Sequence, residues 1–288
     1  METAMESAQS IPAQHQDTQP GIESKMHPLP VYDTGEKGCG KLRGKVAIIT
    51  GGDSGIGRAV AVSFAKEGAD VVIVYLNEHG DAKLTAEAVA KYNKKALLIA
   101  ADLSEENNCK SVIDKTLAQF KHLDILVNNA GVQYPKEEFT DISGEQLLNT
   151  FKTNIFSQFY LVKYAVPYLK EGSTIINTTS ITAYRGHETL VDYSSTKGAI
   201  VSFTRSLSQS LAEKGIRVNA VAPGPVWTPL IPSTFSAEEV SKFGKNTAYD
   251  RPAQPAEIAP CYVFLACGDS AFMTGQVLHP NGGSVVNA

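Results

Sequence analysis

Two side chains four residues apart, Tyr193 and Lys197, form the pair in this sequence with the clearest chemical use. The apolar spacing that follows predicts a helix over residues 193–211, which would place both side chains on one helical face. An ammonium near a phenol favours the phenolate, so Lys197 should lower the pKa of Tyr193. A phenol tuned in this way could give or take a proton at a carbonyl or an alcohol. Such pairs also occur by chance on surface helices, so the interpretation needs further residues.

Two polar residues upstream, Ser180 and Asn154, supply partners for this chemistry. Ser180 ends a buried-looking strand, where its hydroxyl could donate to a substrate oxygen, although an ordinary loop serine would look the same. Asn154 lies inside a long helical stretch, where asparagine is a poor choice unless its side chain or a local kink is used. We expect it to hold a water molecule that links Lys197 to solvent.

A glycine-rich turn over residues 50–57 lies between a β-branched apolar run at residues 46–49 and a helical repeat at residues 56–66. A helix N-terminus offers unpaired N–H groups and a positive dipole end, and glycines let the backbone approach a pyrophosphate closely. Arg58 and Ala59 follow Gly57, where a phosphate-loop NTPase needs Lys and then Ser or Thr. The turn therefore favours a dinucleotide, although glycines also serve as turn formers and packing points.

Composition and charge exclude several classes of protein. The chain has 288 residues, 43% hydrophobic and 19% charged, with a net charge of −4 and no dense basic block, which argues against nucleic acid and membrane partners. It has no apolar run near the roughly 20 residues that cross a bilayer and no apolar signal segment, so we expect a cytoplasmic protein. The cysteines lack metal-site spacing, which predicts buried reduced thiols and no metal. They are Cys39, Cys109, Cys261 and Cys267.

Strand-like apolar runs alternate with helical segments from residue 42 onward. This alternation predicts an α/β fold with parallel strands, crossover helices on both faces and a doubly wound open sheet. Ligands of such sheets bind beyond the carboxyl ends of the strands. The candidate strands are residues 46–49, 71–75, 96–100, 125–127, 174–177, 218–221 and 276–278.

Residues 1–40 differ from the rest of the chain, because they are rich in Gln, Ser, Pro, Glu and His. The prolines interrupt helices and strands, which predicts an extended N-terminal arm before a single domain over residues 41–288. The arm could be a disordered tail, but we favour docking of its C-terminal half. The apolar residues expected to dock are Met26, Leu29, Val31 and Tyr32.

In their order along the chain, these motifs resemble those of the short-chain dehydrogenase/reductase superfamily. The resemblance spans residue 41 to the C-terminus, and within the superfamily it is greatest to glucose and ribitol dehydrogenases and general stress oxidoreductases. It implies a Rossmann-type sheet of about seven strands in the order 3-2-1-4-5-6-7, and usually a homotetramer packed through the helix at residues 199–211. The matching motifs are Thr50-Gly-x-x-x-Gly55-Ile-Gly57, Asn128-Asn-Ala-Gly131, Asn154, Ser180, Tyr193-x-x-x-Lys197 and Pro223-Gly224.

The resemblance also implies a role for each matched residue. Tyr193 would be the general acid in reduction and the general base in oxidation, while Ser180 would orient the carbonyl. Lys197 would bind the nicotinamide ribose, and Asn154 would anchor a proton-relay water. Substrate contacts would come from Ser180, Thr182, Tyr193, Gln133 and Trp227. Contacts to NAD or NADP would come from Tyr193 and Lys197, and from Gly51, Asp53, Ser54, Gly55, Ile56, Gly57, Tyr75, Asn77, Asp102, Leu103, Asn129, Ala130, Gly131, Pro223, Gly224, Val226 and Thr228.

The choice of coenzyme and substrate stays open. The second strand ends in Tyr75 and Leu76 rather than in a charged residue that would select NAD or NADP. Residues 227–249, here named the lid segment, contain prolines, serines and threonines as a mobile lid over a small aldehyde, ketone, sugar or polyol would. We expect an enzyme acting on CH–OH donors; the alternative is a catalytically idle NAD(P)-binding redox sensor or scaffold.

Overall fold

The computed structural model describes residues 11–286, and within them seven parallel strands form one sheet in the order β3-β2-β1-β4-β5-β6-β7. The predicted fold class and strand order are therefore confirmed. The strands form where β-branched and other apolar residues run together, because both faces of a parallel sheet are covered. Their bounds are β1 Val46–Thr50, β2 Asp70–Tyr75, β3 Ala96–Ala100, β4 Ile125–Asn128, β5 Thr174–Thr178, β6 Arg217–Val221 and β7 Val277–Leu278.

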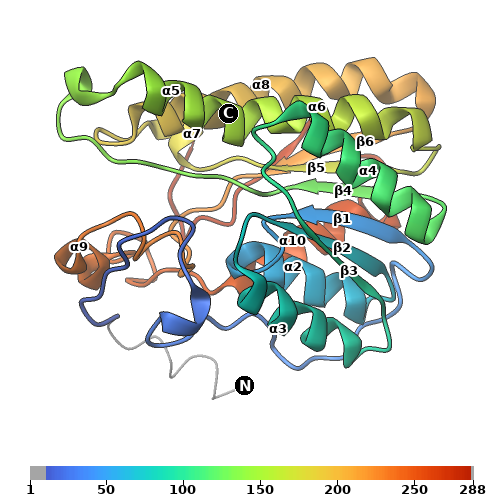
Figure 1. Cartoon of the computed structure of the whole chain (residues 1–288), viewed down its shortest axis with the longest axis horizontal. Helices are drawn as coiled ribbons and strands as arrows, with labels where there is room; N and C mark the ends of the chain where they lie inside the picture. Colours follow the sequence, from blue (N-terminus) through green and yellow to red (C-terminus); the bar gives the residue numbers. More distant parts are fainter. Residues whose placement is uncertain (1–10, 287–288) are drawn as a thin grey trace.

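Helices cover both faces of the sheet (Figure 1). Side chains alternate along β1, so Ala47 and Ile49 join one buried cluster while Ile48 joins the other. Helices α2 (Gly55–Lys66), α3 (His79–Ala90) and α10 (Pro255–Ala266) pack on the first face. The second face is covered by α4 (Glu106–Phe120), α6 (Ser157–Ala165) and α8 (Val191–Leu211), with α5 (Gly144–Phe151) beside them.

The long helix that carries the predicted Tyr–Lys pair begins two residues earlier than expected. Asp192 lies in the first turn of α8, where a carboxylate is favourable at the positive end of the helix dipole. Its two oxygens accept hydrogen bonds from Tyr193 N at 2.8 Å and Thr150 Oγ1 at 2.9 Å. This buried carboxylate therefore fixes the start of α8 against α5.

Short elements connect the larger ones and shape the open end of the sheet. A four-residue helix, α7 (Thr182–Arg185), follows β5, and α9 (Ala237–Lys242) lies within the lid segment. Single 3-10 turns are η2 (Glu23–Lys25), η3 (Phe139–Asp141), η5 (Val166–Tyr168), η6 (Ala212–Lys214) and η7 (Gly268–Ser270). Among the described residues, no helix combines the length and the apolar character needed to cross a membrane.

The described part of the arm, residues 11–40, lies along the lid segment and the α2 side of the sheet (Figure 1). Met26 is buried in a small cluster with Trp227, Ile231 and Val240. Tyr32 packs against the sheet-face cluster of α2 and α10. Leu29, which we expected to dock, is instead 60% exposed. The arm makes extensive polar contacts in addition to apolar ones, and these are described below.

Candidate active site

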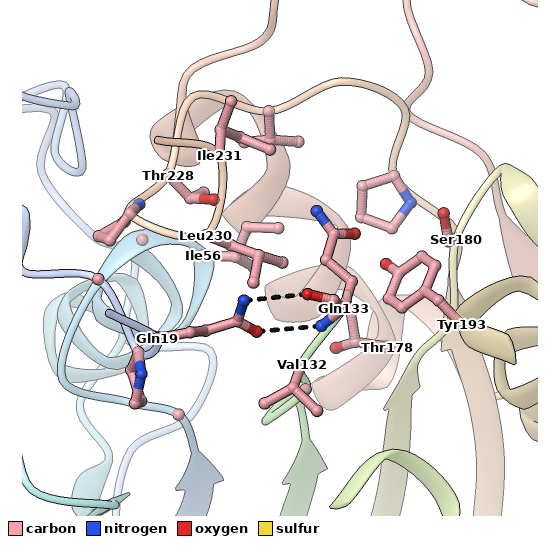
Figure 2. A pocket seen from close by; sticks show the side chains of 18 of the residues that line it. Gln19, Ile56, Val132, Gln133, Thr178, Ser180, Tyr193, Thr228, Leu230 and Ile231 are labelled. Carbon is pink, nitrogen blue, oxygen red and sulfur yellow. Dashed lines mark hydrogen bonds between the residues drawn. The ribbon is translucent and has the colours of Figure 1, made fainter. Parts of the chain in front are cut away.

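A cavity of about 820 Å³ opens at the carboxyl ends of the strands. Six of the seven strands contribute the residues that follow them, as expected for a doubly wound sheet. Helix α7 and the lid segment also line it, and Figure 2 shows this region from close by. The ends of β1 to β6 each contribute at least one lining residue; in this order they include Gly51, Leu76, Ala101, Asn129, Thr179 and Pro223.

Most of the residues singled out from the sequence line this one cavity. Gly57, Asn77, Asn154 and Trp227 do not. Ser180, Tyr193 and Lys197 line it, together with Gln133 and Thr182 from the expected substrate set. The lining members of the expected coenzyme set are Gly51, Asp53, Ser54, Gly55, Ile56, Tyr75, Asp102, Leu103, Asn129, Ala130, Gly131, Tyr193, Lys197, Pro223, Gly224, Val226 and Thr228.

The glycine turn runs from β1 into α2 and adopts conformations that favour glycine. Gly51 has a φ of +60° and Gly55 a φ of +50°, both in the left-handed region. A Cβ on Gly57 would lie 1.8 Å from the carbonyl oxygen of Gly51, so Gly57 lets α2 pack on the turn rather than facing the cavity. The first N–H groups of a helix have no acceptor within the helix; in α2 the Gly55 N–H donates to Glu23, which leaves those of Ile56 and Gly57 for an anion.

The end of β4 is tied to the glycine turn through Thr50. Its hydroxyl oxygen accepts hydrogen bonds from Asn129 N at 2.8 Å and Ala130 N at 3.0 Å, and Asn129 Nδ2 donates to the Thr50 carbonyl at 3.1 Å. Gly131 lies beside the Tyr–Lys pair, since a Cβ there would make an ordinary van der Waals contact with Lys197 Nζ at 3.6 Å. The loop after β4 therefore lines the cavity between the glycine turn and the Tyr–Lys pair.

Tyr193 and Lys197 project from one face of α8 into the cavity. Lys197 is 3% exposed, and its Nζ donates a 3.0 Å hydrogen bond to the carbonyl oxygen of Thr178 at the end of β5. Nζ lies 5.3 Å from the centre of the Tyr193 ring. Ser180 follows the same strand, and Figure 2 shows its hydroxyl on the Tyr193 side of the cavity. Two elements, β5 and α8, thus bring together the three side chains.

The expectation that Lys197 lowers the pKa of Tyr193 is wrong for this site. Burial raises the pKa of Tyr193 to about 12, and the nearby Ser180 hydroxyl offsets only part of that rise. Burial also lowers the pKa of Lys197 to about 8. Both shifts favour the neutral forms, because loss of water destabilises each charge. At this separation, burial outweighs the attraction between an ammonium and a phenolate.

Asn154 lies behind the cavity in a π-helical turn, Lys152–Phe156, between α5 and α6. This turn is the local irregularity that an asparagine inside a helix suggested. The side chain is fully buried; Oδ1 accepts from Val132 N at 2.8 Å, and Nδ2 donates to Val132 O at 2.9 Å and Thr196 Oγ1 at 3.1 Å. Asn154 therefore joins the loop after β4 to α8.

Trp227, expected to contact the substrate, lies away from the cavity. Its side chain is completely buried in the cluster with Met26, and its Nε1 donates a 2.8 Å hydrogen bond to the carbonyl oxygen of Pro28. The indole therefore anchors the arm to the lid segment. Asn77 is exposed beside Glu78 and also lies outside the cavity lining. Neither residue is retained among the candidate contacts.

Comparisons with known proteins identify the family. The family model described as Enoyl-(Acyl carrier protein) reductase matches residues 51–284. The chain is 60% identical to General stress protein 39 of Bacillus subtilis, over 96% of this chain and 97% of that protein. It is 52% identical to Glucose and ribitol dehydrogenase of Daucus carota, over 98% and 100%. The chain belongs to the short-chain dehydrogenase/reductase superfamily.

Solved structures of the superfamily have the same fold. A short-chain dehydrogenase from Burkholderia cenocepacia in complex with NADP matches with a TM-score of 0.79 and 28% identity, over 84% of this chain and 98% of that one. A 3-ketoacyl-(acyl-carrier-protein) reductase from Brucella melitensis complexed with NADH matches with a TM-score of 0.77 and 32% identity, over the same shares. Both solved chains are almost completely covered, whereas about a sixth of this chain falls outside each match.

The sequence did not indicate that the arm contributes residues to the cavity. Gln19, Pro20 and Gly21 line the cavity. Farther along the arm, Glu23 accepts a 2.6 Å hydrogen bond from Gly55 N, at the start of α2, and pairs with buried Arg58. No local pattern pointed to these contacts, because each joins the arm to residues at least 30 positions away.

Arg58 and Asp53 also differ from what their positions suggested. Arg58 follows the glycine turn, but it is buried against Glu23, Asp81 and Thr85 rather than facing the cavity. Asp53 does line the cavity, and burial raises its pKa to about 7, with the charges of Glu78 and Asp81 adding to the rise. The described residues contain no group of three or more His, Cys, Asp or Glu side chains placed to hold a metal ion.

Proposed function

We propose that this protein transfers a hydride between NAD or NADP and the carbonyl or alcohol carbon of a small aldehyde, ketone, sugar or polyol. The observation that carries the proposal is one continuous cavity with the glycine turn at one part of its wall and Ser180, Tyr193 and Lys197 at another. Relatives named for dehydrogenase activity and solved neighbours bound to NADP or NADH support it.

A dinucleotide fits the residues present. Gly51 and Gly55 have a positive φ, which favours glycine, so no side chain covers the turn at these positions. The Gly55 N–H donates to Glu23, and the N–H groups of Ile56 and Gly57 after it are the ones that a pyrophosphate would bind. Asp102, Leu103 and Tyr75 line the part of the cavity beyond β2 and β3, where we assign the adenosine. When bound, the coenzyme supplies or accepts the hydride.

The chain's own groups handle the proton and the substrate oxygen. In reduction, the Tyr193 hydroxyl donates its proton to the carbonyl oxygen, while the Ser180 hydroxyl donates a hydrogen bond that fixes the same oxygen. Lys197 is held by Thr178 O with its Nζ 5.3 Å from the centre of the Tyr193 ring, and its ammonium stabilises negative charge that develops on the phenol. Asn154 holds the backbone of Val132 and thereby positions the adjoining loop.

The form of the coenzyme is left as NAD or NADP. Tyr75 and Leu76 offer no charge at the ribose end, and Arg58 is occupied by Glu23 and Asp81. Of the solved relatives, one is in complex with NADP and another is complexed with NADH. A relative in Arabidopsis thaliana, 50% identical over 96% of this chain and 98% of its own, is named NADPH-dependent aldehyde reductase 1, chloroplastic.

Tyr193→Phe tests the proposal. The variant keeps the ring and its packing but removes the proton donor, so turnover should fall by at least about a hundredfold while coenzyme binding persists, because general acid–base catalysis contributes factors of roughly 10²–10⁴. Tyr168→Phe, on an exposed turn, is the matched control and should behave as wild type. Turnover retained in Tyr193→Phe would reject the role of this phenol.

The alternative is a catalytically idle redox sensor that binds NAD(P) and signals through the arm. A spectrophotometric screen for reduced nicotinamide, with both coenzymes against aldehydes, ketones, sugars and polyols, separates the two functions. The enzyme oxidises or reduces at least one of these compounds; the sensor binds coenzyme tightly and turns over none. The presence of Ser180, Tyr193 and Lys197 in one cavity favours the enzyme, since a sensor has no use for all three.

We further propose that the protein is a cytoplasmic homotetramer. The observation that supports assembly is a group of large apolar side chains exposed on α5, at the end of the π-helical turn and on α6, next to α8. Contiguous exposed apolar side chains often mark protein interfaces. They are Leu147, Leu148, Phe156 and Phe159.

A further inference from the structure

The N-terminal arm crosses the cavity at Gln19. The side chain lies between the glycine-turn side and the loop after β4, and Figure 2 shows it joined to Gln133 by two hydrogen bonds. Gln19 Nε2 donates to the carbonyl oxygen of Gln133 at 3.0 Å, and Gln133 N donates to Gln19 Oε1 at 3.0 Å. The amide thus pairs with one residue's backbone much as a neighbouring strand would.

The lid segment also makes hydrogen bonds to Gln19 and Gln133. Thr234 Oγ1 lies 3.3 Å from Gln133 Nε2, which donates to it, and 3.5 Å from Gln19 Nε2. Gln133 is only 4% exposed, and Figure 2 shows it between Gln19 and Tyr193. Gln19 therefore joins three segments far apart in sequence: the arm, the loop after β4 and the lid segment.

The backbone on either side of Gln19 is fixed to the lid segment. Gln16 N donates a 2.7 Å hydrogen bond to the carbonyl oxygen of Pro232. A Cβ on Gly21 would lie 2.4 Å from the carbonyl oxygen of Pro229, so only glycine permits this approach. Beyond Gly21, Glu23 binds Gly55 N and Arg58. Because the arm is held at these points, the Gln19 amide has little freedom to leave Gln133.

We propose that Gln19 is a positioning residue of the active site, which holds Gln133 and the lid segment at the distance from Tyr193 that suits a small substrate. The inference rests on the proposed function, and it specifies which residues bound the substrate end of the cavity. Leu230 and Ile231 of the lid segment also line the cavity. If Gln19 lost its bonds, Gln133 and these side chains would be free to move outward and the substrate end would widen.

Gln19→Ala tests the proposal, and Gln14→Ala is its matched control. Gln14 makes the same pair of amide bonds with one residue's backbone, since His27 N donates to its Oε1 at 2.9 Å and its Nε2 donates to His27 O. Those bonds stay within the arm. With the substrate that the coenzyme screen identifies, Gln19→Ala should raise KM about tenfold, the effect of one to two net hydrogen bonds, and leave kcat within about twofold.

Three further readouts separate positioning from a general loss of structure. The coenzyme dissociation constant should be unchanged in Gln19→Ala, and the preference for the small substrate over a bulkier homologue should fall about tenfold. Amide hydrogen exchange over residues 231–235 should become faster in Gln19→Ala and remain as in wild type in Gln14→Ala. Equal effects of the two variants, or an unchanged KM and selectivity in Gln19→Ala, would overturn the proposal.

The exchange experiment also distinguishes this proposal from the proposed function. If wild type turned over no compound of the screen, the oxidoreductase assignment would fail, but the exchange comparison would still decide whether Gln19 holds the lid segment. Faster exchange confined to Gln19→Ala supports the positioning role in that case, and unchanged exchange rejects it. If Tyr193→Phe is inactive while Gln19→Ala matches wild type in every readout, only the inference about Gln19 fails.

Discussion

Burial controls the chemistry of the two ionisable residues at the centre of the site. A phenol whose pKa is raised to about 12 stays protonated through the neutral range, so the proton donor for reduction is always present. Such a phenol is a weak acid, however, and the charge that develops on it needs a cation nearby. Lys197 can supply that charge only below its own pKa of about 8. The ammonium, rather than the phenol, should therefore limit the pH range of reduction.

Lys197→Arg tests this limit. Below about pH 8 the wild-type lysine is charged, and above it the amine loses its proton, so kcat/KM for reduction should fall about tenfold per pH unit beyond pH 8. Arginine stays protonated far above this range, so the variant, whatever its maximal rate, should show no such fall up to about pH 10. Initial rates at low substrate concentration give both profiles. A fall at the same pH in both proteins would show that another group titrates.

Asp53 connects burial with stability. Its pKa is raised from 3.8 to about 7, so between these values the folded protein binds more protons than the unfolded chain, and stability decreases as the pH rises. Asp53→Asn removes the titration while keeping the shape. It should be more stable than wild type at pH 8, by at most about 4 kcal/mol, and equal to it near pH 4. Urea unfolding at several pH values measures this; a pH-independent difference would contradict it.

The positions of the strands along the chain and of the glycine turn could be predicted because the sequence carries a local signal for each, whereas the order of the strands in the sheet was implied by the family resemblance. Apolar runs such as residues 46–49, the glycine turn and the Tyr193–Lys197 spacing depend only on neighbouring residues. Asn154 indicated that either its side chain or a local kink is used, and the structure has both, a π-helical turn and side-chain hydrogen bonds to Val132. The raised pKa of Tyr193 could not be predicted from the sequence, because the burial of its side chain depends on how β5 and α8 pack. Spacing shows which side chains meet, but not how much water remains.

Two glycines at the starts of helices have opposite roles, which gives a matched test of the turn. In Gly57→Ala, the new Cβ would lie 1.8 Å from the backbone oxygen of Gly51, which cannot move without disrupting β1 and α2. This change should destabilise the fold by about 3 kcal/mol or more and weaken coenzyme binding. In Gly80→Ala on α3, nothing lies within 4 Å, so the helix should gain about 0.5 kcal/mol. Thermal unfolding and coenzyme titration compare the two variants, and equal melting temperatures would contradict this assignment.

At the scale of the whole molecule, the arm is the part that the sequence describes least well. Composition indicated an extended segment, and apolar residues indicated docking, but its partners lie tens to hundreds of positions away. Met26 reaches Trp227, Gln19 reaches Gln133, and Glu23 reaches Arg58. Leu29 remains exposed, although the carbonyl oxygen of the preceding Pro28 is bound to the Trp227 indole. Long-range polar pairs of this kind have no periodicity that a sequence could display.

Assembly is the remaining property of the whole molecule, and the exposed side chains of α6 allow it to be tested. Phe159 is 52% exposed and stacks on Phe203 of α8 with the ring centres 4.2 Å apart, so both helices contribute to this apolar surface. A charge at its centre would be buried without a partner in a tetramer. Phe159→Asp should therefore reduce the assembly to smaller species, while Leu84→Asp, at a site 48% exposed on α3, should not.

Light scattering after size-exclusion chromatography should give about four times 30.9 kDa for wild type and Leu84→Asp, and a smaller mass for Phe159→Asp. A wild-type mass of one chain, or an undiminished mass in Phe159→Asp, would show that this surface does not form the interface.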